Sequence, residues 1–269
     1  MVTIHPSAVV HKSAQLAPDV IVGPHCVVGD AVSIDSGSIL DANVVIDGSV
    51  KIGKNNHFFP GCVIGCKPQV LALSPNTKIG GVIIGDGNAF RECVTIHPSM
   101  SPERFTKIGN DNFIMVGAHV GHDCVLEDKI VMSNCVLIAG HCKIESGVWI
   151  SGLVGVHQFV TMGRWVYAAG LAGINRDIPP FLIVSGHYPQ RIRGVNKRGL
   201  QRAGLTGEQQ QRIQEAYKRL YRQGGALLEN AKLLAQEDGL DENVRAMVEA
   251  ITRSSEHQFG RYLETFRKH

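Results

Sequence analysis

The sequence predicts an all-β solenoid built from hexapeptide repeats, followed by an α-helical C-terminal region. Three observations support this prediction: large apolar residues recur every six positions, turn-forming residues follow them, and the pattern becomes helical beyond about residue 200. Neither a helix nor an alternating strand has a six-residue period, whereas stacked hexapeptide coils do. The period forms two runs: Ile4, Val10, Leu16, Val22, Val28, Ile34, Leu40, Ile46, Ile52, Phe58 and Ile64, then Ile84, Phe90, Ile96, Ile108, Ile114, Val120, Leu126, Met132, Ile138, Ile144, Ile150, Val156 and Met162.

Each residue of this period is expected to be the inward side chain of a short strand. Three hexapeptides then close one triangular coil, and the coils stack at about 4.8 Å, the spacing of neighbouring strands. Glycine, asparagine and aspartate follow the apolar residue, as in Ile52-Gly53-Lys54-Asn55. These residue types suit tight corners with positive φ.

Two interruptions break the period. The first runs from about Cys66 to Val82 and shifts the phase, because 20 residues separate Ile64 from Ile84. The second runs from about Pro98 to Lys107 and keeps the phase. Insertions in solenoids project as loops and often build the binding face.

The C-terminal region reads as helical. Thr206 followed by Gln209 resembles a capping box, so a helix should begin there and end at Gly224-Gly225. Further helices are expected at 226–236, 242–252 and 255–267. We therefore divide the chain into a catalytic β-helix domain of residues 1–185 and a helical domain of residues 186–269, which should cover the open end of the solenoid.

Composition excludes several classes of protein. A formal charge of +3 gives no argument for a nucleic-acid partner. The chain has no run of about 18 apolar residues, so no membrane span is expected. The first ten residues lack the pattern of a signal peptide, and the seven cysteines show no disulfide framework. These features favour a cytoplasmic protein, for which we expect no cofactor.

Five histidines gather in the central coils: His97, His119, His122, His141 and His157. None occupies an inward position, so all should face outward or line a corner. Residues 18 apart should stack, which places His122 beside Gly140 and Gln158, and Asp123 below His141. Gly140 has no side chain and so leaves space for the His122 ring.

Three interpretations of the histidines compete. A histidine supported by Asp123 suits general-base catalysis on a hydroxyl. His119, His122, Cys124 and His141 include ligand types of a zinc site, as in a zinc hydrolase or hydratase, if they converge on one point. Scattered histidines on the surface and corners are the third interpretation, and residue spacing alone leaves all three open.

Several ordered motifs carry a more specific signal. They are Arg91-Glu92-Cys93-Val94-Thr95-Ile96-His97, then His119-Val120-Gly121-His122-Asp123-Cys124, Ala139-Gly140-His141, and Val156-His157-Gln158-Phe159. With them, the chain resembles the UDP-N-acetylglucosamine O-acyltransferase family of lipid A biosynthesis over essentially its whole length. The resemblance implies a left-handed parallel β-helix, where the usual preference for right-handed crossovers would predict the opposite hand. It also implies a cytosolic homotrimer with active sites between neighbouring prisms.

The resemblance further implies the reaction and the residues that perform it. An (R)-3-hydroxyacyl chain would pass from acyl carrier protein to the sugar 3-hydroxyl, with His122 as general base, Asp123 as its partner and no metal. Gly170 would limit acyl length, and its lack of a side chain would leave room for a longer chain. Substrate-binding residues would be His97, His119, Gly140, His141, His157, Gln158, Asn196 and Arg202.

Two stretches leave questions open. Residues 178–207 contain no acidic residue, and their basic residues form either a solvated surface or a docking patch for an acidic carrier or a diphosphate. Where the family carries charged or polar residues, this chain has Val70, Ala72, Arg198 and Ala203. The alternatives are therefore an acyltransferase acting on a different nucleotide sugar, or a non-catalytic trimeric protein that binds a nucleotide sugar.

Overall fold

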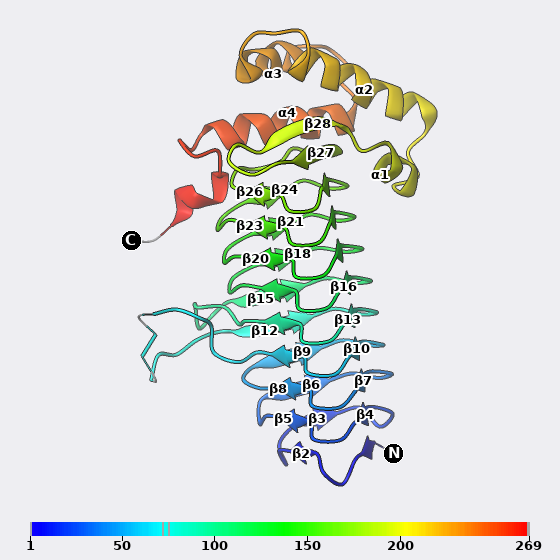
Figure 1. Ribbon diagram of the computed structural model, residues 1–269, viewed down its shortest axis with the longest axis vertical. Helices are drawn as coiled ribbons and strands as arrows, with labels where there is room; N and C mark the ends of the chain where they lie inside the picture. Colours follow the sequence, from blue (N-terminus) through cyan, green and yellow to red (C-terminus); the bar gives the residue numbers. More distant parts are fainter. Residues whose placement is uncertain (1, 72, 75, 268–269) are drawn as a thin grey trace.

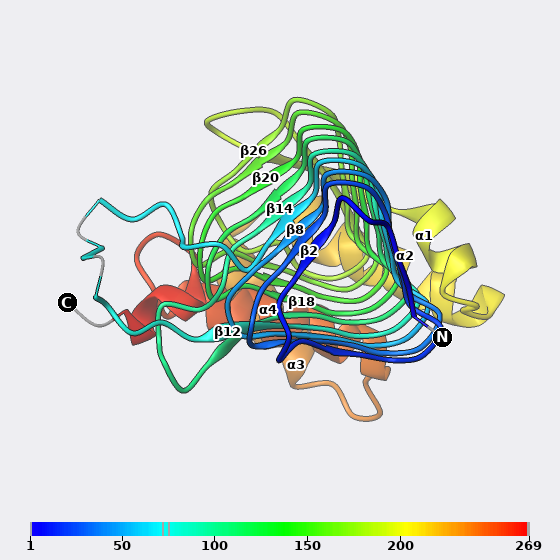
Figure 2. The ribbon, with the colours of Figure 1, turned by 90° about the horizontal axis from the view of Figure 1, so that it is seen from below.

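The chain forms a three-sided prism of stacked coils with helices over its C-terminal end (Figure 1). The computed structural model describes residues 2–71, 73–74 and 76–267. Three sheets form the sides, and every strand pairing among the described residues is parallel except that of β27 with β28. Seen from the N-terminal end in Figure 2, the chain winds anticlockwise as it recedes, so the coil is left-handed. The predicted fold class is confirmed.

The strands are short and follow the six-residue period. Sheet A contains β1 (Thr3–Ile4), β4 (Ile21–Val22), β7 (Ile39–Leu40), β10 (His57–Phe58), β13 (Ala89–Phe90), β16 (Phe113–Ile114), β19 (Val131–Met132), β22 (Trp149–Ile150), β25 (Tyr167–Ala168), β27 (Leu182–Ser185) and β28 (Arg191–Val195). Sheet B contains β2 (Val9–Val10), β5 (Val27–Val28), β8 (Val45–Ile46), β11 (Val63–Ile64), β14 (Thr95–Ile96), β17 (His119–Val120), β20 (Leu137–Ile138), β23 (Gly155–Val156) and β26 (Gly173–Ile174). Sheet C contains β3 (Gln15–Leu16), β6 (Val32–Ile34), β9 (Val50–Ile52), β12 (Gly81–Ile84), β15 (Phe105–Ile108), β18 (Val125–Leu126), β21 (Lys143–Ile144) and β24 (Thr161–Met162).

The residues of the period form the core of the prism. From Val22 to Met162, every one of them is buried. The exceptions belong to the first coil, where Ile4 remains 43% exposed because no coil lies beneath it. Phe58 and Phe90 stack with their ring centroids 4.8 Å apart, which is the spacing of the coils themselves.

The two insertions leave the coil where the period is interrupted. β11 pairs directly with β14, so Val63 lies opposite Thr95 although 32 residues separate them in the sequence. Corners adopt the expected positive φ at Asn55 and at Asp111. The same conformation occurs at Leu153 and Leu171, where it strains a residue with a branched side chain and where no turn-forming residue predicts it.

A ladder of buried amides spans both insertions. Asn88 donates from its side chain to Oδ1 of Asn56 at 2.9 Å, and Asn112 donates to Oδ1 of Asn88 at 2.9 Å. The backbone N–H of Ile130 donates to Oδ1 of Asn112 at 2.8 Å and ends the ladder. Each amide thus finds a partner inside the prism, as a buried polar group must.

The C-terminal region differs in part from the expectation. Neither α1 (Lys197–Arg202) nor the β27–β28 hairpin was predicted. The hairpin spans the proposed domain boundary between residues 185 and 186, and the division into two domains stays a prediction. The capping box of Thr206 and Gln209 is confirmed and begins α2 (Gly207–Tyr221). α3 (Leu227–Ala235) follows.

The predicted helix at 255–267 is wrong. α4 (Glu242–Ser255) already includes Ser255, and Gly260 then turns the chain with a φ of 65°. Only a short 3₁₀ helix, η1 (Tyr262–Phe266), follows. The physical reason is tertiary: the N–H of Asp177 donates to the Gly260 carbonyl at 2.7 Å and ties this turn to the solenoid. None of the helices in the described residues has the length and hydrophobicity needed to span a lipid bilayer.

Candidate active site

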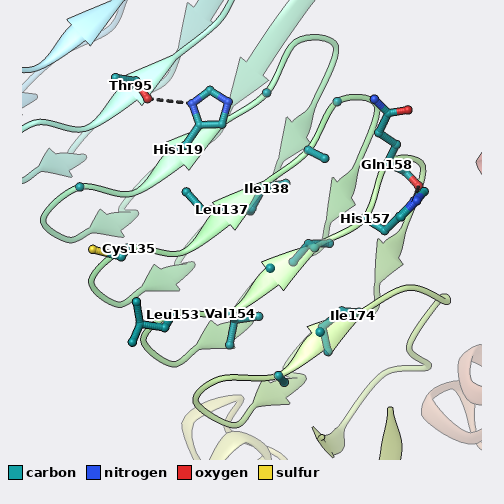
Figure 3. A pocket seen from close by; sticks show the side chains of 18 of the residues that line it. Thr95, His119, Cys135, Leu137, Ile138, Leu153, Val154, His157, Gln158 and Ile174 are labelled. Carbon is teal, nitrogen blue, oxygen red and sulfur yellow. Dashed lines mark hydrogen bonds between the residues drawn. The ribbon is translucent and has the colours of Figure 1, made fainter. Parts of the chain in front are cut away.

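An open groove of about 940 Å³ runs along the outer face of sheet B (Figure 3). Figure 3 shows His157 and Gln158 at one end of the strands, and Cys135 and Leu153 at the other. The polar side of the groove is lined by Gln69, Thr95, His97, His119, His122, Gly140, His157 and Gln158, and the apolar side by Leu137, Leu153 and Leu171. The groove therefore joins a set of hydrogen-bonding groups to an apolar strip.

His122 and Asp123 form a hydrogen-bonded pair beside this groove. Nδ1 of His122 lies 2.8 Å from Oδ2 of Asp123, and both side chains are largely buried. Asp123 sits at a corner with a φ of 62°, which turns its side chain toward the preceding residue. Because the carboxylate accepts a hydrogen bond from the Nδ1–H group, the proton of the neutral ring stays on Nδ1 and Nε2 carries the lone pair. This is the arrangement of a general base and its orienting acid.

Asp123 is held by groups from the second insertion. Ser99 donates from Oγ to Oδ1 of Asp123 at 2.5 Å, and the Met100 N–H donates to Oδ2 at 3.1 Å. The N–H of Asp123 donates to Oγ1 of Thr106 at 2.9 Å. Burial alone would raise the pKa of Asp123, but hydrogen bonds from His122, Ser99 and Met100 outweigh it and lower that pKa to about 2. The carboxylate is therefore ionised at neutral pH.

Gly140 makes room for the His122 ring, as the sequence predicted. A Cβ added at Gly140 would lie 2.7 Å from both Cε1 and Nε2 of His122. His141 meets His122 edge-on, with centroids 4.9 Å apart, and stacks on Phe159 with centroids 4.6 Å apart. Burial lowers the pKa of His141, although the Asp123 carboxylate opposes that shift. Phe159 was missed as a site residue, yet it follows His141 by one 18-residue coil.

His97 and His119 form a second pair of rings. Their centroids lie 4.8 Å apart, and Nδ1 of His119 lies 2.7 Å from Oγ1 of Thr95 (Figure 3). Burial lowers the pKa of His97 to about 4 and also lowers the pKa of His119. Both rings are neutral at pH 7, so each can donate and accept a hydrogen bond without bringing a charge.

Four of the residues predicted to bind substrate or limit acyl length do not line the groove, and one of them, His141, lies instead beside His122. Asn196 is buried and caps α1, accepting from the Gly199 N–H and donating to the Trp165 carbonyl. Arg202 stacks its guanidinium over the Trp149 ring on the outer face of sheet A, 4.8 Å from the centroid. Gly170 is exposed at a corner, one residue before Leu171, which does line the groove. Figure 2 shows α1 beside sheet A and the strands of sheet B on another side of the prism.

The structure describes three of the four positions at which this chain departs from the pattern of the family. Gln69 lines the groove, whereas its neighbour Val70 is half-buried in the first insertion. Ala72 lies outside the described residues. Arg198 is exposed on α1, and Ala203 caps the end of that helix.

The four residues considered for a zinc site do not converge. Cys124 is buried and its thiol donates to the Ala139 carbonyl at 3.1 Å, inside the prism. The ligand-type atoms that do converge, within 4.8 Å in the described part of the chain, belong to His122, Asp123 and His141. This cluster is the acid–base pair with its neighbouring ring.

Comparisons with known proteins point to one family. A family model described as Udp N-acetylglucosamine O-acyltransferase, domain 2, matches residues 177–259. An acyl-[acyl-carrier-protein]–UDP-N-acetylglucosamine O-acyltransferase from Synechocystis is 44% identical over 172 residues, which span 64% of this chain and 61% of that protein. The enzyme of the same name from Anaeromyxobacter is 37% identical over 198 residues, or 73% of this chain and 76% of that protein.

Solved structures extend the similarity over nearly the whole chain. The UDP-N-acetylglucosamine acyltransferase of Francisella novicida superposes with a TM-score of 0.88 at 37% identity and covers 93% of this chain and 91% of that one. The Arabidopsis UDP-N-acetylglucosamine acyltransferase superposes with a TM-score of 0.82 at 29% identity, covering 95% of this chain and 98% of that one.

Proposed function

Because the chain belongs to the UDP-N-acetylglucosamine O-acyltransferase family, we propose that it transfers an (R)-3-hydroxyacyl chain from acyl carrier protein to UDP-N-acetylglucosamine. The acceptor is the sugar 3-hydroxyl, and the reaction is the first step of lipid A biosynthesis. The single observation that carries the proposal is the His122–Asp123 pair, set beside a groove with one polar and one apolar side.

The geometry supports one proton path. Nε2 of His122 accepts the proton of the sugar 3-hydroxyl while the hydroxyl oxygen attacks the thioester carbonyl carbon. The carbon–sulfur bond then breaks, and the imidazolium returns the proton to the departing thiolate. Asp123, which is ionised and bonded to Nδ1, stabilises the imidazolium in between. The Gly140 N–H has no acceptor among the described residues and lies next to His122, where it suits the oxyanion of the tetrahedral intermediate.

The remaining groove residues suit the two substrates. The neutral rings of His97 and His119, with His157 and Gln158, offer hydrogen bonds to sugar hydroxyls and to the amide of the acyl-carrier arm. Leu153 and Leu171 are 61% and 70% exposed although they are apolar and strained, which suits coverage by an acyl chain.

Gly170 supports a role in acyl length. A Cβ added there would meet nothing closer than the Gly152 carbonyl at 3.5 Å, so the chain itself leaves this corner open. We expect Gly170→Leu to shift the acyl preference toward shorter chains, measured by competition between carriers of different acyl length.

A homotrimer would complete the site. The outer residues of sheet A include Ile21, Ile39, Phe113, Val131 and Trp149, and those of the first four strands of sheet B are Val9, Val27, Val45 and Val63, whereas the outer residues of sheet C include Lys51, Lys107 and Lys143. Apolar areas on two faces and lysines on the third fit a closed ring in which sheet A of one copy meets sheet B of the next. Arg202 of α1, whose guanidinium lies over sheet A, would then approach the groove of the neighbouring copy and bind the diphosphate of the nucleotide sugar.

Surface charge and free thiols support the proposed carrier and a cytoplasmic location. Arg191, Arg193, Lys197 and Arg198 are exposed around β28 and α1, and they suit an acidic acyl carrier protein. All seven cysteines are free thiols, which fits the reducing cytoplasm.

The experiment is a transfer assay with purified protein, an (R)-3-hydroxyacyl carrier protein and UDP-N-acetylglucosamine, followed by mass spectrometry. We expect turnover by the wild type, its loss in His122→Ala, and full activity in His11→Ala, an exposed histidine of the first coil. Unchanged turnover in His122→Ala would contradict the mechanism. Val70 favours a second candidate, transfer to a different nucleotide sugar, which predicts turnover only with an amino-sugar analogue of the acceptor. Binding of the nucleotide sugar without any transfer would favour the non-catalytic alternative.

A further inference from the structure

The two insertions are joined at their bases. The Gly80 N–H, at the end of the first insertion, donates to the Ser99 carbonyl at 2.8 Å, and the Ser99 N–H donates to the Gly81 carbonyl at 3.2 Å. The contact is close enough that a Cβ at Gly80 would lie 2.0 Å from the Arg104 carbonyl oxygen. The second insertion therefore folds back on the first instead of only projecting into solvent.

Ser99 stands between this junction and the acid–base pair. Ser99 is fully buried, and its Oγ accepts a hydrogen bond from the Ser101 N–H at 3.0 Å. The same Oγ donates to Oδ1 of Asp123 at 2.5 Å. A second acceptor, the Ser101 carbonyl, lies farther away at 3.2 Å, so the single hydroxyl proton goes to the ionised carboxylate.

The two oxygens of Asp123 have different partners. Oδ2 accepts hydrogen bonds from Nδ1 of His122 and from the Met100 N–H. In the described residues, the side-chain donor to Oδ1 is the Ser99 hydroxyl. Without Ser99, Oδ1 would be an unpaired charged oxygen in a largely buried place. The carboxylate would then turn toward another partner, such as Nε2 of His141 at 3.9 Å, and weaken its bond to His122.

We propose that Ser99 is a positioning residue, which fixes the Asp123 carboxylate and through it the orientation of the His122 base. The second insertion thus serves the proton transfer itself, in addition to shaping the surface. The inference rests on the proposed function for its consequence in turnover, but the positioning of His122 by Ser99 does not depend on which substrate is used.

The kinetic test compares Ser99→Ala with Ser101→Ala, the same substitution two residues away in the same insertion. We expect kcat to fall about 10- to 100-fold in Ser99→Ala, the cost of one charge-assisted hydrogen bond, with KM for both substrates changed less than about twofold. In an Asp123→Ala background, Ser99→Ala should cause no further loss, because residues that act as one unit are not additive. A full, additive loss in that background would show a merely structural role and overturn the proposal.

A second test reads the position of His122 without any turnover. NMR of the His122 ring nitrogens in folded protein at pH 7 should show less of the Nδ1–H tautomer in Ser99→Ala than in wild type, because the Asp123 carboxylate that accepts from Nδ1 is no longer held in place. The groups that face His122 are Asp123, His141, His97 and His119, and all are retained in both variants. An unchanged tautomer population in Ser99→Ala would overturn the proposal, whereas absence of transfer in the wild type would count against the proposed function alone.

Discussion

The imidazole of His122 lies so close to Gly140 that a Cβ on that residue would be 2.7 Å from the ring atoms Cε1 and Nε2. The contact exists because the two residues are 18 positions apart and therefore stack on one edge of the prism. The base can adopt its orientation only because the next coil has no side chain at this corner.

Gly140→Ala should therefore move the His122 ring away from its present position. A Cβ at 2.7 Å from Cε1 and Nε2 cannot coexist with the ring, so we expect kcat to fall about 100-fold or more while the fold persists. Steady-state kinetics and circular dichroism would measure both. Gly207→Ala is a matched control, since a Cβ there meets nothing within 4 Å; equal activity of the two variants would contradict the packing argument.

Asp123→Asn should separate the charge of this residue from its shape. The amide fits the same space but carries no charge to stabilise an imidazolium. Its NH₂ group can also donate to Nδ1, which would favour the tautomer with the proton on Nε2. We expect a kcat lowered about 100-fold or more with little change in KM for the nucleotide sugar. Kinetics at saturating carrier would check this, and a variant with wild-type kcat would exclude Asp123 from the proton path.

His97 should make stability depend on pH. Burial lowers its folded-state pKa to about 4, whereas an unfolded histidine titrates near 6.5, so between these values the unfolded chain binds more protons. The stabilisation from the neutral ring is thus complete above about pH 6.5 and is lost as pH falls toward 4, by up to about 3 kcal/mol.

We expect His97→Gln to flatten this dependence. Urea unfolding at pH 7 and pH 4.5, at one fixed protein concentration, would show a smaller difference in the free energy of unfolding than in wild type. The exposed His11→Gln variant should keep the wild-type difference. A His97→Gln variant with the wild-type slope would show that the buried ring is not the group responsible.

The oligomer should depend on the outer face of sheet B. Val27 is exposed there, and a buried aspartate at an apolar interface is costly, so Val27→Asp should dissociate the trimer. Light scattering should give 87.6 kDa for wild type, three times 29.2 kDa, and 29.2 kDa for the variant. Activity should fall with the mass, because Arg202 would no longer reach a neighbouring groove. Ser33→Asp, on the outer face of sheet C, should remain trimeric; dissociation of both variants would argue against a specific interface.

The six-residue period predicted the prism because every inward residue repeats one geometric role, and the same arithmetic placed His122 beside Gly140. It failed where the chain is not periodic. Ser99 lies in an insertion, and no spacing rule connects it with Asp123, 24 residues later. The resemblance implies that Asn196 binds substrate, yet its amide oxygen caps the helix that follows and its NH₂ group donates to the Trp165 carbonyl of the solenoid.

The segment at 255–267 failed for another reason. Its composition suits a helix, but Gly260 and the bond from Asp177 settle its course, and that bond joins residues far apart in the chain. Local preference predicts a helix only where tertiary contacts do not compete with it.

The ladder of Asn56, Asn88 and Asn112 bears on how the chain acquires its fold. At the two places where an insertion lets the chain leave the coil, an apolar interior would accept several alignments on its return, because one aliphatic residue packs much like the next. Amide side chains accept only the alignment in which each donor meets its oxygen. A coil that paired in another register would bury unpaired amides, which is costly in free energy. The ladder therefore favours the native register as the coils assemble.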